Sequence, residues 1–103
     1  MKLREIAHSR TGDKGNTANI SVIARDPQKY AALARYLTEE RVKEHFSEIV
    51  EGKVSRYELP NIGALNFVLY GALSGGVTRT LAMDLHGKSL CMALMNMDIP
   101  DDL

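Results

Sequence analysis

A short alternating segment at residues 18–25, ANISVIAR, constrains the fold most strongly. Apolar side chains fall on every second position, at Ala18, Ile20, Val22 and Ala24. The positions between them are polar, with Ile23 as the exception. A period of two is typical of a β-strand that buries one face. The segment therefore predicts a sheet whose one face is covered by other parts of the chain.

Two helical segments are expected after this strand. At the start of the first, Asp26 caps and Pro27 occupies the first helical position, where its missing N–H costs nothing. Its apolar stripe is Tyr30, Leu33, Ala34 and Leu37. Thr38 predicts a second cap, and the acidic residues that follow favour a helix start. The second apolar face is Val42, Phe46 and Ile49, with His45 beside it, and Gly52 predicts the stop. The pattern fits two helices or one bent helix.

The remaining segments are mixed. Residues 2–8 and 54–59 predict strands, the second with Tyr57 and Leu59 on its buried side. Residues 64–73 match a helical period, 77–85 predict a strand, and 89–97 fit either a helix or the returning arm of a hairpin. This mixture predicts one domain over residues 1–103, an α+β sandwich with helices on one face of a mainly antiparallel sheet. The expected core is Ile20, Val22, Leu33, Leu37, Phe46, Tyr57, Leu69 and Leu81.

Composition narrows the classes of function. Thirteen basic and thirteen acidic residues leave no net charge, which argues against nucleic-acid and membrane-surface binding. The one cysteine, Cys91, fits a reducing compartment, and the start MKLREIAH has no signal-peptide core, so we expect a cytoplasmic protein. The sequence has neither the paired His or Cys spacing of a metal site nor a known nucleotide-binding motif. We therefore expect no metal and no cofactor.

Residues 9–17 predict a polar loop. Gly12 and Gly15 allow backbone N–H groups to turn toward one point, a geometry that binds anions. The candidate anion-binding side chains are Arg10, Lys14, Asn16, Thr17 and, from a second glycine-rich stretch, Arg79. The alternative is a hairpin-type connection whose polarity is only solvation.

Two further features allow more than one interpretation. His8 adjoins the polar loop and, with Asp13, is a candidate proton-transfer pair. The uncharged run at residues 90–97 and its methionines fit either a core or an adaptable partner surface, and we expect a homo-oligomer or a complex with another chain.

Three segments together resemble one family. SRTGDKGNTANI, LPNIGALNF and the ending DLHGKSLCMALMNMDI are similar to the small C-terminal domain of acyclic terpene utilisation (AtuA-like) proteins, which also occurs as a separate short protein. The resemblance implies a ferredoxin-like fold. It also implies an accessory subunit that partners a large AtuA-type core in bacterial catabolism of terpenoid or branched acyl-CoA compounds, with residues 9–17 as an anion-binding or docking loop. The alternative is a small stand-alone hydratase or lyase acting on an acyl-CoA or carboxylate.

Overall fold

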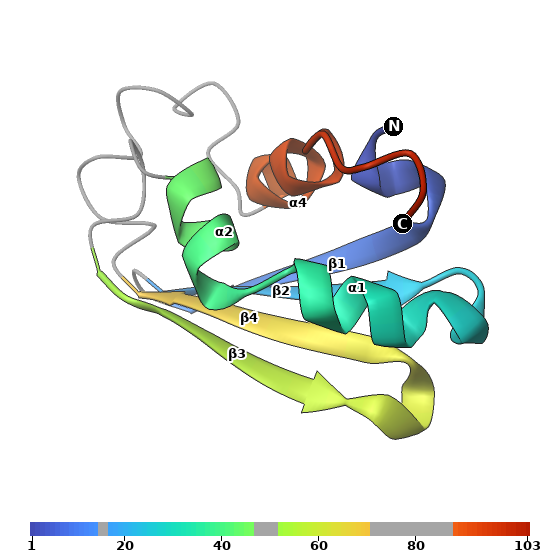
Figure 1. Ribbon diagram of the computed structural model, residues 1–103. Coiled ribbons are helices and arrows are strands. Elements are labelled where there is room, and N and C mark those ends of the chain that lie inside the picture. The colour runs from blue at the N-terminus through green and yellow to red at the C-terminus, as the bar shows by residue number, and fades with distance from the viewer. Residues whose placement is uncertain (15–16, 47–51, 71–87) are drawn as a thin grey trace.

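The computed structural model describes residues 1–14, 17–46, 52–70 and 88–103. Its strands are β1 (Ala7–Lys14), β2 (Thr17–Ala24), β3 (Val54–Leu59) and β4 (Ala64–Tyr70), and its α-helices are α1 (Tyr30–Tyr36), α2 (Glu39–His45) and α4 (Lys88–Met95). The strands form an antiparallel sheet in the order β1-β2-β4-β3. The helices lie on one side of this sheet (Figure 1). The predicted α+β sandwich is therefore confirmed.

The two ends of the chain lie side by side. Ile99 donates its backbone N–H to the Met1 carbonyl at 2.8 Å, and Leu3 donates to the Met97 carbonyl at 2.9 Å. Lys2 and Asp98 form a β-bridge between these segments. The short 3₁₀ helix η1 (Leu3–Glu5) is thereby fixed next to the end of α4.

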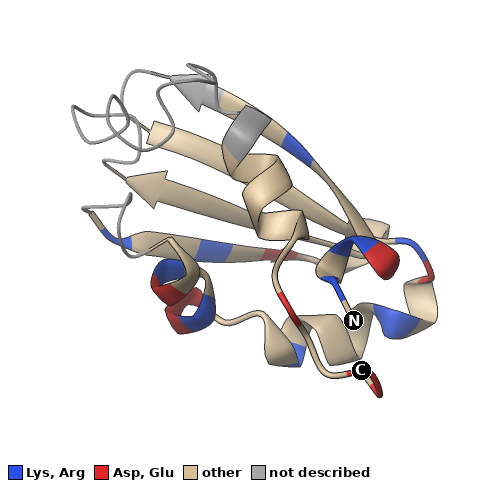
Figure 2. Ribbon diagram, turned by 90° about the horizontal axis from the view of Figure 1, so that it is seen from above, with Lys and Arg blue, Asp and Glu red and all other residues tan. Residues whose placement is uncertain are grey.

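The core lies between the sheet and the helices. Register places alternate residues of β2 and β4 opposite each other, for example Ile20 with Phe67 and Val22 with Leu65. The large side chains of the α-helices that are fully buried are Leu33, Val42, Leu90 and Leu94, joined by Leu37 and Phe46 at the C-terminal caps of α1 and α2. Figure 2 shows that the central strands β2 and β4 hold no charged residue, whereas the outer strands do. Charged residues on outer strands are typical, because these strands border solvent.

Most of the predicted core is confirmed. Ile20, Val22, Leu33, Leu37, Phe46 and Leu69 are all buried. The prediction that Tyr57 belongs to the core is wrong, because Tyr57 pairs with Asn66 on the open face of the sheet and is 52% exposed. Leu81 and the predicted strand at 77–85 lie outside the described residues, as does Ile49 of the second helical face.

The faces of β3 are reversed because charged residues have partners under the helices. The Arg56 guanidinium donates to the carbonyls of Ala34 and Leu37 at 2.7 and 3.4 Å, and pairs with Glu58 at 2.8 Å. These carbonyls belong to the C-terminal end of α1, where backbone acceptors have no partner within the helix. Arg56 therefore faces the helices, and the alternation of the strand turns Tyr57 outward.

The helix caps are confirmed, but two segment assignments change and one open choice is decided. The Asp26 side chain accepts from the Gln28 N–H in η2 (Pro27–Lys29), which leads into α1, and the Thr38 hydroxyl accepts from the Arg41 N–H. Residues 64–70 are strand β4 rather than a helix, because both neighbouring strands pair with them. The predicted strand at 2–8 is η1 followed by the start of β1. The ambiguous segment at 89–97 is helix α4, which ends at Met95.

Candidate functional site

The predicted loop at residues 9–17 is largely a β-hairpin. Arg10 and Gly12 lie within β1 and pair with Ser21 and Asn19, and Lys14 pairs with Thr17 at the hairpin end. The prediction of a loop is thus wrong for residues 9–14, because continuous pairing with β2 satisfies the backbone of this stretch. Gly15, Asn16 and Arg79 lie outside the described residues, and anion binding by this segment stays a prediction.

The histidine and aspartate proposed as a proton-transfer pair are separated. His8 and Asp13 both belong to β1, five positions apart. An extended strand rises roughly 3.3 Å per residue, so their backbones are about 17 Å apart. Proton transfer needs hydrogen-bond distance or one bridging water, and this spacing does not allow a direct pair.

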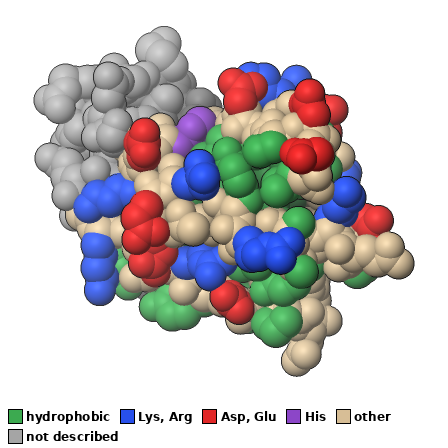
Figure 3. Space-filling view, viewed as in Figure 1, with side chains coloured by type: hydrophobic (Ala, Val, Ile, Leu, Met, Phe, Trp, Pro, Cys, Tyr) green, Lys and Arg blue, Asp and Glu red, His purple; other side chains and the backbone are tan. Residues whose placement is uncertain are grey.

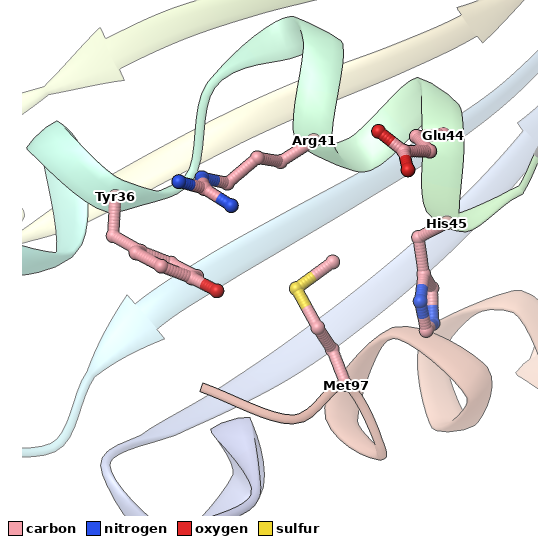
Figure 4. A pocket seen from close by; sticks show the side chains of 5 residues that line it. All are labelled: Tyr36, Arg41, Glu44, His45 and Met97. Carbon is pink, nitrogen blue, oxygen red and sulfur yellow. The ribbon is translucent and has the colours of Figure 1, made fainter. Parts of the chain in front are cut away.

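One cavity of about 400 Å³ lies between the end of α1, α2 and the C-terminal segment, and is lined by Tyr36, Arg41, Glu44, His45 and Met97 (Figure 4). Two of its polar side chains, Arg41 and His45, already have partners in the fold. The Arg41 guanidinium stacks on the Tyr36 ring at 4.1 Å, and the Nε2 atom of His45 lies 2.8 Å from the Ala93 carbonyl oxygen. The latter contact joins α2 to α4. A cation and a carboxylate share this wall, so it selects neither sign of charge, and we interpret the cavity as structural.

A second hollow runs between the outer strand β1 and α4, which we call the β1–α4 groove. Two cavities, of about 380 and 440 Å³, share Ser9, Cys91 and Met92, so they are parts of one groove. The apolar lining is Ala7, Met92 and Met95. At its centre the Cys91 thiol and the Ser9 hydroxyl are hydrogen-bonded to each other. An apolar lining with a few polar groups, at this size, is typical of small-molecule sites.

The rim of the β1–α4 groove is basic. Arg4, His8 and Arg25 line the first cavity, and Arg10 lines the second. Among the residues whose side chains the structure describes, which do not include Asp13, no Asp or Glu lines either one. Over the helix-covered face, in contrast, acidic and basic side chains intermingle (Figure 3). His8 and Arg10, which the sequence analysis gives as candidate site residues, therefore both lie at the groove.

A separate surface feature is an apolar corner formed by Tyr57, Leu59 and Ile62. Tyr57 and Leu59 share the open face of β3, and Ile62 follows in the 3₁₀ helix η3 (Pro60–Ile62). Their exposed fractions are 52, 40 and 66%. Exposed apolar side chains that gather on one surface mark interaction sites more often than scattered ones do.

The topology and these surfaces define a class. In the βαββαβ order of ferredoxin-like domains the last strand lies beside the first. Here β1 lies beside β2 at the edge of the described sheet, where the last strand of that order would lie beside the first. The two chain ends are adjacent, so the arrangement is a circular permutation of the ferredoxin-like order, and the domain is a ferredoxin-like α+β sandwich. The AtuA ferredoxin-like domain model matches residues 1–100, and the chain belongs to this family. Comparison with curated proteins and comparison with solved structures gave no match.

Several groove residues were not singled out as site residues from the sequence. Arg4, Arg25 and Asn96 come from three distant segments: the pairing of β1 with β2 brings Arg25 to Arg4, and the packing of α4 adds Asn96. The uncharged run at 90–97 was a partial signal, because it includes Met92, which is 67% exposed. Within the described part of the chain, no group of three or more His, Cys, Asp or Glu residues has metal-binding geometry, and no helix is long and apolar enough to cross a membrane.

Proposed function

We propose that this chain is an accessory subunit that partners a large AtuA-type core in bacterial catabolism of terpenoid or branched acyl-CoA compounds. The observation that supports the proposal most is the family match, because it spans residues 1–100 and so assigns nearly the whole chain to the small AtuA ferredoxin-like domain. A domain of this kind acts by contact with its larger partner, and its surface must then offer a docking site.

The apolar corner is the docking site that we assign to the core. Tyr57 and Ile62 are each more than half exposed, although their burial would be favourable. Burying a large apolar side chain contributes about 1.5–3 kcal/mol, and aromatic residues are enriched where partners meet. The corner borders the open face of β3, where Tyr57 pairs with Asn66, so the partner contacts the sheet side opposite α1, α2 and α4, which no helix of the described residues covers.

Co-expression with a large AtuA-type subunit, followed by co-purification and a measured dissociation constant, tests this assignment. Ile62→Glu places a charge in the corner and should weaken the complex about tenfold or more. Ala31→Glu is the matched control, because Ala31 is exposed on α1, on the opposite side of the sheet. The control should bind like the unchanged chain.

Two results would count against the proposal. The first is a failure to bind any co-expressed AtuA-type core. The second is turnover of an enoyl-CoA by the purified chain alone, with loss of activity in His8→Ala, which would favour the hydratase or lyase alternative. Equal binding by Ile62→Glu and Ala31→Glu would be compatible with the proposed partner but would exclude the apolar corner as its docking site.

A further inference from the structure

The β1–α4 groove differs from the apolar corner in both shape and charge, and its function is a separate question. Its walls come from β1 on one side and α4 on the other, joined at the Ser9–Cys91 contact. From Ala7 to Thr11 the strand side is about 13 Å long. Methionine side chains line the helix side, and these adapt to the shape of an apolar ligand.

Two arginines are held together at one end of this groove. The Nε atom of Arg25 donates to the Arg4 carbonyl at 3.1 Å, and the Arg4 guanidinium donates to the Asn96 side-chain oxygen. Within the described residues, the ion pairs involve Met1, Lys2 and Arg56, so neither arginine is neutralised by a carboxylate. The C-terminal end of α4 brings roughly half a negative charge near this point. Two guanidinium groups outweigh it, and the end of the groove attracts an anion.

We propose that the β1–α4 groove binds a monocarboxylate with a hydrocarbon chain. The carboxylate lies at Arg4 and Arg25, whose planar forks match its two oxygens. The hydrocarbon chain lies along Ala7, Met95 and Met92 toward Thr11. The charge and the apolar lining both argue for this ligand, because a small inorganic anion would leave the methionine surface uncovered and a neutral hydrocarbon would bring no negative charge to the two arginines.

The single cysteine gives a direct test on the isolated chain. Cys91 lines both cavities, so a bound ligand should shield its thiol from alkylation by iodoacetamide, an uncharged reagent. Octanoate, used below its micelle concentration, should slow alkylation about tenfold at ten times its Kd. Acetate, which lacks the chain, and octanamide, which lacks the charge, should protect far less at the same concentration. Circular dichroism confirms that the fold is unchanged by each compound.

Variants identify the charged end. Arg25→Gln should raise the octanoate concentration for half-protection about tenfold or more, the equivalent of one charge-assisted hydrogen bond. Arg4→Gln tests the same end if Arg25→Gln perturbs the fold. Arg35→Gln is the matched control, because Arg35 is exposed on α1 and lines neither cavity.

The proposal is overturned by any of three results: no protection by octanoate, equal protection by octanamide, or equal behaviour of the Arg25, Arg4 and Arg35 variants. None of these measurements involves the large subunit. Failure of octanoate binding is therefore distinguishable from failure of docking at the apolar corner.

Discussion

Replacing Arg56 tests whether a charged residue under the helices stabilises the fold. In Arg56→Met the aliphatic part of the side chain is kept and the guanidinium is lost. The lost contacts are the donor bond to the Ala34 carbonyl at 2.7 Å, the longer one to Leu37 at 3.4 Å, and the ion pair with Glu58. The Ala34 and Leu37 carbonyls then lack these donors at the end of α1.

The contacts of Arg56 differ in how much they contribute to the free energy of unfolding. A hydrogen bond to a charged donor contributes about 1.5–3 kcal/mol, and the 2.7 Å contact to Ala34 is the strong one. The Glu58 side chain is 55% exposed, so its ion pair with Arg56 adds roughly 0–1 kcal/mol. The expected loss is therefore about 2–3 kcal/mol in the free energy of unfolding, or a fall in Tm of about 10–20 °C.

Urea unfolding followed by circular dichroism measures this loss directly. Glu58→Gln is the control, because it removes the ion pair and leaves the carbonyl contacts of Arg56 in place. The control should lose at most about 1 kcal/mol. If Arg56→Met were no more destabilised than Glu58→Gln, the carbonyl contacts would contribute nothing and our explanation of the reversed β3 faces would be refuted.

Two other perturbations have defined outcomes. Thr38→Ala removes the hydroxyl that accepts from the Arg41 N–H, and should cost about 1 kcal/mol of unfolding free energy in the same urea assay; Thr38→Ser should restore most of it, and equal loss in both variants would contradict the cap. The pKa of Asp98 lies below its ordinary value because Lys2 donates a hydrogen bond to it and attracts it. A lowered folded-state pKa gives a contribution to stability that is present above the unfolded pKa of about 3.9 and is lost as pH falls through the folded value, so the acid side of the stability profile should be flatter in Asp98→Asn.

The sequence was sufficient to predict those elements whose structure depends on residues close together in the chain. The strand at 18–25, the Asp26 and Thr38 caps and the sandwich itself were predicted because period, capping chemistry and element order are all local. Residues 64–73 predict a helix because Leu65, Val68, Leu69, Ala72 and Leu73 fit a period of 3.6. The same segment also contains Leu65, Phe67 and Leu69 at a period of two, and only pairing with β2 and β3 selects the strand.

Long-range packing decides the rest. The sequence predicts Tyr57 in the core because its side chain is largely apolar. The carbonyls that hold Arg56 on the helix side of β3 belong to α1, so the sequence of the strand gives no sign of them. The candidate site shows the same limit. Ser9 and Cys91 are 82 residues apart in the chain, and the groove between them exists only after α4 packs on β1. The sequence could indicate His8 and Arg10 as chemically interesting, but not that Arg4 and Arg25 lie at the same groove.

The pairing of the two chain ends has a consequence for how the molecule opens. The backbone bonds between Met1 and Ile99 join residues 98 positions apart, and closing such a loop in an unfolded chain costs roughly 4 kcal/mol of entropy. In the folded state the sheet has already brought the ends together, so each end is held at little extra cost. Since the Leu3 and Ile99 N–H groups each donate to a carbonyl of the other terminal segment, loss of one segment leaves the N–H of the other without its acceptor. The two termini should therefore fray as one cooperative unit, with common amide exchange rates at Leu3 and Ile99, rather than independently as free ends do.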